Sequence, residues 1–186
     1  KAMVLAATFV VGTAHAAVLF NNGPVVDANG KSILAANATT IGYGVQIDSN
    51  NAIADDFNVT AGESWNITSF DLFSYQTGST GFTFSSVKWS IVKDNANTGA
   101  VLASGTTTPT NGGLVGYRVT PTTLNNTTRG IYRLSVDMPD LDLSAGHYWL
   151  RWSIDGTLAS GPWQPPTSDN RLGNAMQSVS GGNFSA

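Results

Sequence analysis

The stretch Tyr148-Trp149-Leu150-Arg151-Trp152-Ser153-Ile154 decides the fold class, because its side chains alternate with a period of two. Successive side chains of an extended strand point to opposite faces of a sheet. One face of this stretch is large and apolar, formed by Tyr148, Leu150, Trp152 and Ile154. The other face carries Trp149, Arg151 and Ser153. The pattern predicts a β-strand with one buried face.

The same period recurs along the chain, within residues 41–47, 65–72, 87–91, 115–119 and 131–136. A one-residue slip between Ile67 and Phe70 predicts a bulge or a change of inward face. Residues that tolerate positive φ separate these runs, in the segments 27–30, 94–99, 111–113 and 155–156. With no long helical stripe, we predict an all-β fold: an antiparallel two-sheet β-sandwich, jelly-roll-like, of about eight to ten strands.

Two stretches depart from regular alternation. Residues 105–110 are rich in Thr and predict a loop or an exposed edge. Residues 160–169 contain Pro162, Pro165 and Pro166, which predict an irregular loop because proline cannot donate to a sheet ladder.

Composition restricts the function classes. The chain has 186 residues, 41% hydrophobic and 10% aromatic, which is enough for a core and suits one domain. Charged residues make up only 11%, and the net charge of −3 argues against nucleic acid as a partner. Cysteine is absent, which excludes disulfides, thiolate zinc sites and cysteine nucleophiles.

Residues 1–16 have the order of a secretory signal peptide. Lys1 precedes an apolar run, and Ala14-His15-Ala16 matches a small-residue cleavage site. The apolar run is too short to span a bilayer, so we expect cleavage after Ala16 and no membrane insertion of the remaining domain, residues 17–186. One alternative is that residues 4–18 form a buried strand or helix of the fold. Another is that residues 1–20 are retained and donate a strand to a neighbouring subunit.

Several short motifs resemble a known family. They are Asn21-Asn22-Gly23-Pro24, Ala54-Asp55-Asp56-Phe57, the strand that begins at Trp65, and Ala145-Gly146-His147-Tyr148-Trp149-Leu150. The chain resembles the secreted bacterial β-sandwich proteins of the choice-of-anchor or PEP-CTERM type. The resemblance implies a bacterial extracellular-matrix or cell-surface protein without a defined reaction. The family usually ends in a sorting tail that is absent from this chain, so we expect either a truncated C-terminus or a tail-less relative.

The motifs of common enzymes are missing. No G-x-S-x-G occurs, and His147 is the only histidine after the predicted leader. We interpret His147 as a half-exposed strand residue. Glu63 is the only glutamate, so a glycosidase-like pair would have to come from aspartates.

Two acidic groups are candidate calcium ligands. Asp55 and Asp56 lie in an otherwise apolar run, so one of them should point inward, where a carboxylate needs hydrogen-bond donors or a cation. Asp137, Asp140 and Asp142 flank Pro139, and we interpret them as a solvated loop or as oxygen ligands for calcium.

Aromatic side chains suggest a second kind of site. Trp149 is out of phase with the apolar face of its strand, and Trp163 lies in the proline-rich loop beside Gln164. Exposed indoles that stack on sugar rings, with an amide at the rim, would bind carbohydrate. Trp65, Trp89 and Trp152 are predicted core residues, and burial of all five indoles is the alternative.

Four functions remain open. The leading hypothesis is a secreted, non-enzymatic protein of structural or adhesive type, with no cofactor and with polysaccharide or surface proteins as partners. The alternatives are a carbohydrate-binding module with structural calcium, an Asp-dependent hydrolase, and a polymerising subunit that donates an N-terminal strand.

Overall fold

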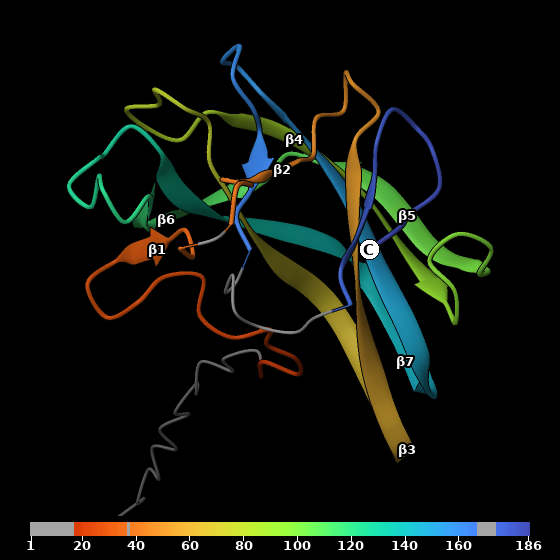
Figure 1. Cartoon of the computed structure of the whole chain (residues 1–186). Helices are drawn as coiled ribbons and strands as arrows, with labels where there is room; N and C mark the ends of the chain where they lie inside the picture. The colour runs from red at the N-terminus through yellow and green to blue at the C-terminus, as the bar shows by residue number, and fades with distance from the viewer. Residues whose placement is uncertain (1–16, 37, 167–173) are drawn as a thin grey trace, which may run out of the picture.

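The computed structural model describes residues 17–36, 38–166 and 174–186 (Figure 1). The predicted signal peptide, residues 1–16, lies outside the described residues. Nine strands occur in the described part of the chain: β1 (Lys31–Ile33), β2 (Tyr43–Gly44), β3 (Ala52–Ser74), β4 (Phe84–Lys93), β5 (Val101–Thr107), β6 (Thr110–Val119), β7 (Gly130–Gly156), β8 (Trp163–Gln164) and β9 (Met176–Ser178). The all-β prediction is confirmed. Within these ranges we find no helix of the length and apolarity that a bilayer crossing requires.

The fold is built around one long antiparallel ribbon of β3 and β7. Its pairing runs from Ile53 opposite Trp152 to Ser74 opposite Tyr132. Two register shifts interrupt it, one after Val59 and one after Ile67. The second shift confirms the irregularity that the slip in the sequence predicted. It also brings Pro139 into the irregular part of β7, where its missing N–H costs no ladder bond.

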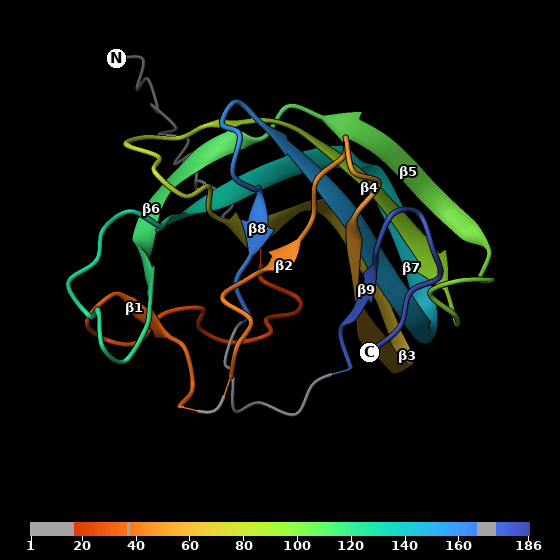
Figure 2. The same ribbon diagram turned by 45° about the horizontal axis from the view of Figure 1, so that its top comes forward.

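The other strands add to both halves of the ribbon. β4 pairs with the second half of β7, and β5 extends the sheet beyond β4. β6 pairs with the first half of β7, β1 pairs with β6, and β9 pairs with the start of β3. The two halves of the ribbon are formed by the same two strands, β3 and β7, so all these strands belong to one sheet. This sheet curls into an arch (Figure 2).

The topology departs from the predicted antiparallel two-sheet sandwich. The main sheet is a single curled one, and it is mixed, since β1 runs parallel to β6. The second sheet is only the short pair β2 and β8, which lies on the concave side of the arch (Figure 2). One of the predicted loops contains a strand, since residues 163–164 form β8. Residues 105–107 of the Thr-rich run belong to β5, which pairs only with β4, so the predicted exposed edge is confirmed.

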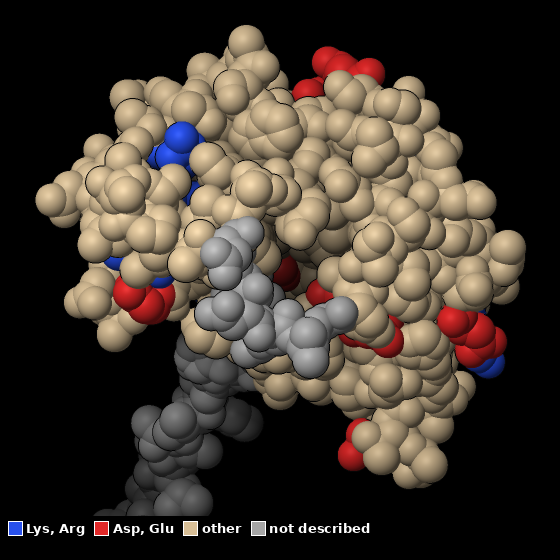
Figure 3. Space-filling model, viewed as in Figure 1, with Lys and Arg blue, Asp and Glu red and all other residues tan. Residues whose placement is uncertain are grey.

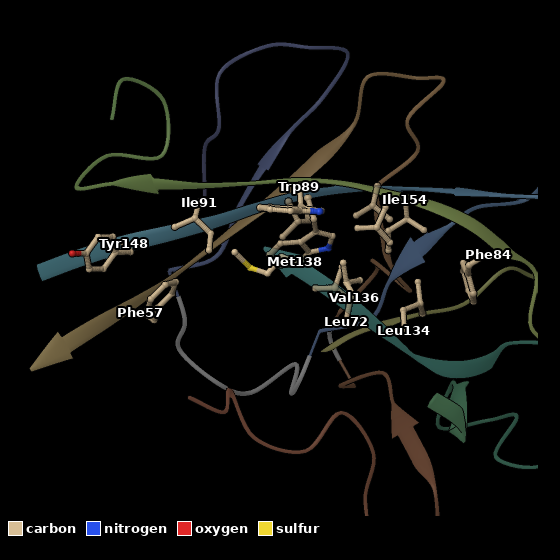
Figure 4. Packing of buried hydrophobic residues seen from close by; sticks show 14 of the residues in the cluster. Phe57, Leu72, Phe84, Trp89, Ile91, Leu134, Val136, Met138, Tyr148 and Ile154 are labelled. Carbon is tan, nitrogen blue, oxygen red and sulfur yellow. The ribbon is translucent and has the colours of Figure 1, made fainter. Parts of the chain in front are cut away.

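The main core fills the inside of the arch. Trp89 and Ile154, from β4 and the end of β7, face Val136 and Leu134 from the start of β7 (Figure 4). Tyr148, Trp152 and Ile154 are buried in this core and Leu150 packs against it, as the alternation in the sequence predicted. The core therefore joins the two halves of the ribbon.

A smaller apolar cluster lies on the opposite face of the sheet. It contains Ala54, Val92, Ala96 and Trp149, with Met176 and Phe184 packed against it. The segment around β9 thus covers a face that the alternation of β7 alone would leave to solvent. This contact buries the Trp149 side chain.

Candidate ligand-binding cavity

A shallow cavity of about 410 Å³, largely open to solvent, lies between the end of β3, β8 and the segment before β2. Three kinds of side chain form its wall: aromatic rings, hydroxyl groups and one guanidinium. The lining residues are Thr39, Thr40, Ile41, Gly42, Tyr75, Thr77, Arg129, Ser160 and Trp163. None of these described residues is acidic. The cavity is therefore amphipathic, with a cationic side chain in its wall.

Trp163 is held firmly at this wall. Its N–H donates to the Tyr75 carbonyl at 2.9 Å, and its own carbonyl accepts from the Tyr75 N–H at 3.0 Å. The Ser74 hydroxyl donates to the same Trp163 carbonyl at 2.9 Å. At the ring, Nε1 donates to Ser160 Oγ at 3.3 Å. These bonds fix the backbone and the orientation of the indole before any ligand arrives.

Two glycines make room beside these aromatic side chains. Gly161 has φ +97°, and a Cβ there would lie 2.7 Å from Cδ1 of Trp163. A Cβ on Gly42 would lie 2.6 Å from the Tyr75 hydroxyl and 3.0 Å from Cβ of Trp163. A side chain at either position would collide with the aromatic wall, so the shape of the cavity depends on both glycines.

The Tyr75 hydroxyl lies next to this space. Burial raises the pKa of Tyr75 to about 12, although the guanidinium groups of Arg118 and Arg129 lower it. The phenol is therefore neutral at physiological pH and can both donate and accept. No other described residue is hydrogen-bonded to this hydroxyl.

Arg118 lies behind the cavity wall and donates to the backbone of two lining residues. Its side chain is only 1% exposed. It donates from Nε to the Ile41 carbonyl at 2.7 Å and from Nη2 to the Thr40 carbonyl at 3.4 Å. Nη1 donates to Ser32 Oγ at 3.1 Å. Arg118 thereby holds two lining residues in place and brings a second positive charge close to the phenol.

Arg129 differs from Arg118, because no acidic side chain among the described residues forms an ion pair with it. Nη1 is buried without a hydrogen-bond acceptor among the described residues. The ion pairs in the described ranges join Arg133 to Asp71 and His147 to Asp56. A buried donor without an acceptor is costly, and this one belongs to a residue that lines the cavity.

Of the predicted sugar-binding residues, only Trp163 lines the cavity. Trp149 is 5% exposed, beneath the cluster with Phe184, and its Nε1 donates to the Asp94 carbonyl at 3.2 Å. Of the two alternatives for Trp149, exposure and burial, the structure shows burial, because the C-terminal segment covers the indole. Gln164 lies outside the lining, and its Nε2 donates to the Pro165 carbonyl at 3.2 Å.

Asp55 and Asp56 point to opposite faces, as predicted. Asp55 shares a face with the core residue Phe57, and burial raises its pKa despite bonds from the Asp56 N–H and the Asn22 amide. The half-buried carboxylate of Asp55 thus has hydrogen-bond donors, which is one of the two kinds of partner that the sequence analysis predicted.

Asp56 bonds to His147 instead. His147 Nε2 lies 2.5 Å from Asp56 Oδ2, and Nδ1 lies 3.1 Å from the Asp94 carbonyl oxygen. Both partners are acceptors, so an imidazole with protons on both nitrogens satisfies both bonds. A hydrolase base would need a nucleophile at one of these nitrogens, and here both are engaged.

The second acidic group lies in a strand and not in a loop. Asp137, Asp140 and Asp142 all belong to β7, and Asp142 Oδ1 accepts from the Asn66 amide at 2.8 Å. Among the described residues, no three acidic, His or Cys side chains come together as a metal site. The predicted calcium ligands are therefore not gathered here.

No sequence motif pointed to Tyr75 or Arg129, which both line the cavity. Tyr75 follows directly after the last residue of β3, and Arg129 directly precedes β7. The only sequence signal for either is its place beside a strand end, and that signal is shared with many other residues. Their meeting depends on the pairing of β3 with β7, which brings Ser74 opposite Tyr132.

Comparison with known proteins adds no name to this site. No family model, no curated protein and no solved structure matches the chain.

Proposed function

We propose that this protein is a secreted, non-enzymatic β protein of the cell surface or extracellular matrix that binds saccharides at the Trp163 cavity. Secretion rests on the leader pattern of residues 1–16. In this proposal the curled sheet takes the place of the expected jelly-roll-like sandwich as a rigid scaffold. The adhesive role then follows from binding a polysaccharide, which is the partner class suggested by the sequence.

The observation that carries the proposal is the composition of the cavity wall. Trp163 and Tyr75 supply aromatic surface, which suits the apolar C–H faces of a sugar ring. Thr39, Thr40 and Ser160 supply hydroxyls, which exchange hydrogen bonds with sugar hydroxyls. A volume of about 410 Å³ lies in the usual range for small-molecule pockets. One or two sugar units fit this chemistry.

The test is binding of the full chain to a glycan array, followed by calorimetry with the saccharides that are retained. Trp163→Ala should weaken binding at least tenfold, which corresponds to about 1.4 kcal/mol. Gly42→Ala should weaken it as well, because the new Cβ would lie 2.6 Å from the Tyr75 hydroxyl.

Tyr43→Ala is the matched control. Tyr43 is an exposed aromatic residue of β2, next to β8 but outside the cavity lining. It should bind like the wild type. Retention of no glycan by the wild type, or equal losses in Trp163→Ala and Tyr43→Ala, would contradict the proposal.

A further inference from the structure

We infer that the cavity selects a carboxylate-bearing saccharide, such as a uronic acid, and that Arg129 is the residue that recognises the carboxylate. This inference rests on the saccharide-binding function proposed above and adds the charge of the ligand to it.

Arg129 has a guanidinium nitrogen that donates to no described residue. Its Nη1 is buried, and no described residue accepts from it. A guanidinium presents its N–H groups as a planar fork that matches the two oxygens of a carboxylate. Because Arg129 lines the cavity, a carboxylate that enters the cavity meets this guanidinium.

The surroundings make the cavity positive. Arg118 and Arg129 both act on Tyr75, so both charges lie close to the same phenol. The described lining contains no acidic residue beside Arg129. On the face of the molecule shown in Figure 3, the group of Lys or Arg atoms at the upper left has no Asp or Glu atoms beside it. An anion therefore meets attraction near Arg129.

The remaining donors suit an acidic sugar better than a free inorganic anion. The Tyr75 hydroxyl is neutral and can donate, and the hydroxyls of Thr39, Thr40 and Ser160 line the same space. Trp163 supplies the aromatic wall for the ring that bears the carboxylate. A carboxylate, a ring face and several hydroxyls are what a uronic acid offers together.

The experiment compares oligosaccharides of galacturonic, glucuronic and mannuronic acid with their methyl esters, using calorimetry on the full chain. Esterification removes the charge and keeps the ring and its hydroxyls. The wild type should bind at least one acid tenfold or more tightly than its ester, and this preference should shrink as salt concentration rises.

Two arginine variants test whether Arg129 recognises the carboxylate. Arg129→Gln should bind the acid and the ester equally, with the acid weakened at least tenfold and the ester unchanged. Arg133→Gln should keep the preference of the wild type, because Arg133 is a half-exposed partner of Asp71 outside the cavity lining. Thermal unfolding checks both proteins, and Arg129→Gln should be at least as stable as the wild type.

The outcomes separate the two proposals. If the wild type binds a neutral saccharide through Trp163 and shows no preference for acids over esters, the inference about Arg129 fails and the saccharide function stands. A preference for acids that survives in Arg129→Gln also overturns the inference. If the wild type binds neither acids, esters nor any neutral glycan, the saccharide function itself fails.

Discussion

Asp55 and Asp56 are identical neighbours, yet they meet different environments because they point to opposite faces of β3. Asp55 lies on the side of the core residue Phe57, where burial raises its pKa. Asp56 lies on the other side and bonds to His147. Position on a strand, and not residue type, therefore decides the state of each carboxyl.

Because Asp55 is half-buried, we expect Asp55→Asn to raise the free energy of unfolding by an amount that depends on pH. Because the folded state holds a proton on Asp55 more tightly than the unfolded chain, the contribution of Asp55 to stability falls as pH rises through its raised pKa. Asp55→Asn should therefore be more stable than the wild type at pH 7, and the difference should vanish below the ordinary pKa of 3.8. Urea unfolding across this pH range measures it.

Asp140→Asn is the control for that measurement. Asp140 is an exposed residue of β7, so its substitution should change stability by less than about 0.5 kcal/mol. A loss of stability in Asp55→Asn at pH 7 would show that the bonds from Asn22 and the Asp56 N–H outweigh the cost of burying the charge.

Tyr75 gives a second prediction at the scale of one residue. Its phenol should ionise near pH 12, against an ordinary value of 10.0, because burial disfavours the charged form. The ultraviolet difference spectrum between the wild type and Tyr75→Phe should show no phenolate near pH 10. Circular dichroism at each pH confirms that the protein is still folded. A phenolate band already present at pH 10 would mean that Tyr75 is open to water.

At the scale of elements, the C-terminal segment is a cover for the outer face of the sheet. Phe184 packs against the cluster that contains Trp149, and its ring centroid lies 6.0 Å from Cζ of Arg151. The Asn97 side chain fixes the backbone of Phe184, accepting from its N–H at 2.7 Å and donating to its carbonyl at 3.0 Å. The 94–99 turn and the end of the chain thus close over Trp149 together.

Phe184→Ala should lower the free energy of unfolding by about 1–2 kcal/mol, because a partly buried ring is removed from an apolar cluster. Val179→Ala is the matched control, since Val179 lies in the same segment and is 60% exposed. It should change stability by less than about 0.5 kcal/mol. Urea unfolding of both variants measures the difference, and equal effects would show that the segment does not hold the cluster together.

At the scale of the whole molecule, one core unites both halves of the curled ribbon. Leu134, from the start of β7, and Ile154, from its end, are both fully buried in it. A core shared in this way predicts cooperative unfolding in which both halves are lost together.

Leu134→Ala should destabilise the protein by about 2–5 kcal/mol, because it leaves a cavity in the shared core. Leu114→Ala, at a residue of β6 that is 46% exposed, should cost less than about 0.5 kcal/mol. Circular dichroism and tryptophan fluorescence should follow one coincident transition in both variants. Two separate transitions would show that the halves of the ribbon are independent.

The sequence by itself determined the longer strands and the inward face of the second half of β7. Alternation within 148–154 predicted the burial of Tyr148, Trp152 and Ile154, and the slip after Ile67 predicted an irregularity that the pairing confirms. These features are local, because the backbone alternates from one residue to the next whatever lies beyond it. Trp163 could be singled out in the same way, as an aromatic residue in a proline-rich stretch.

Only the tertiary structure decided how the sheet closes and which side chains meet. One long ribbon curls into an arch where a two-sheet sandwich was expected. Trp149 is buried in a cluster against which Phe184 packs, and His147 bonds to Asp56. The tertiary structure also brought Tyr75, Arg129 and Trp163 to one cavity from three separate parts of the chain. Contacts between residues far apart in the chain depend on strand register and on what covers each face, and neither is encoded in the periodicity of a single strand.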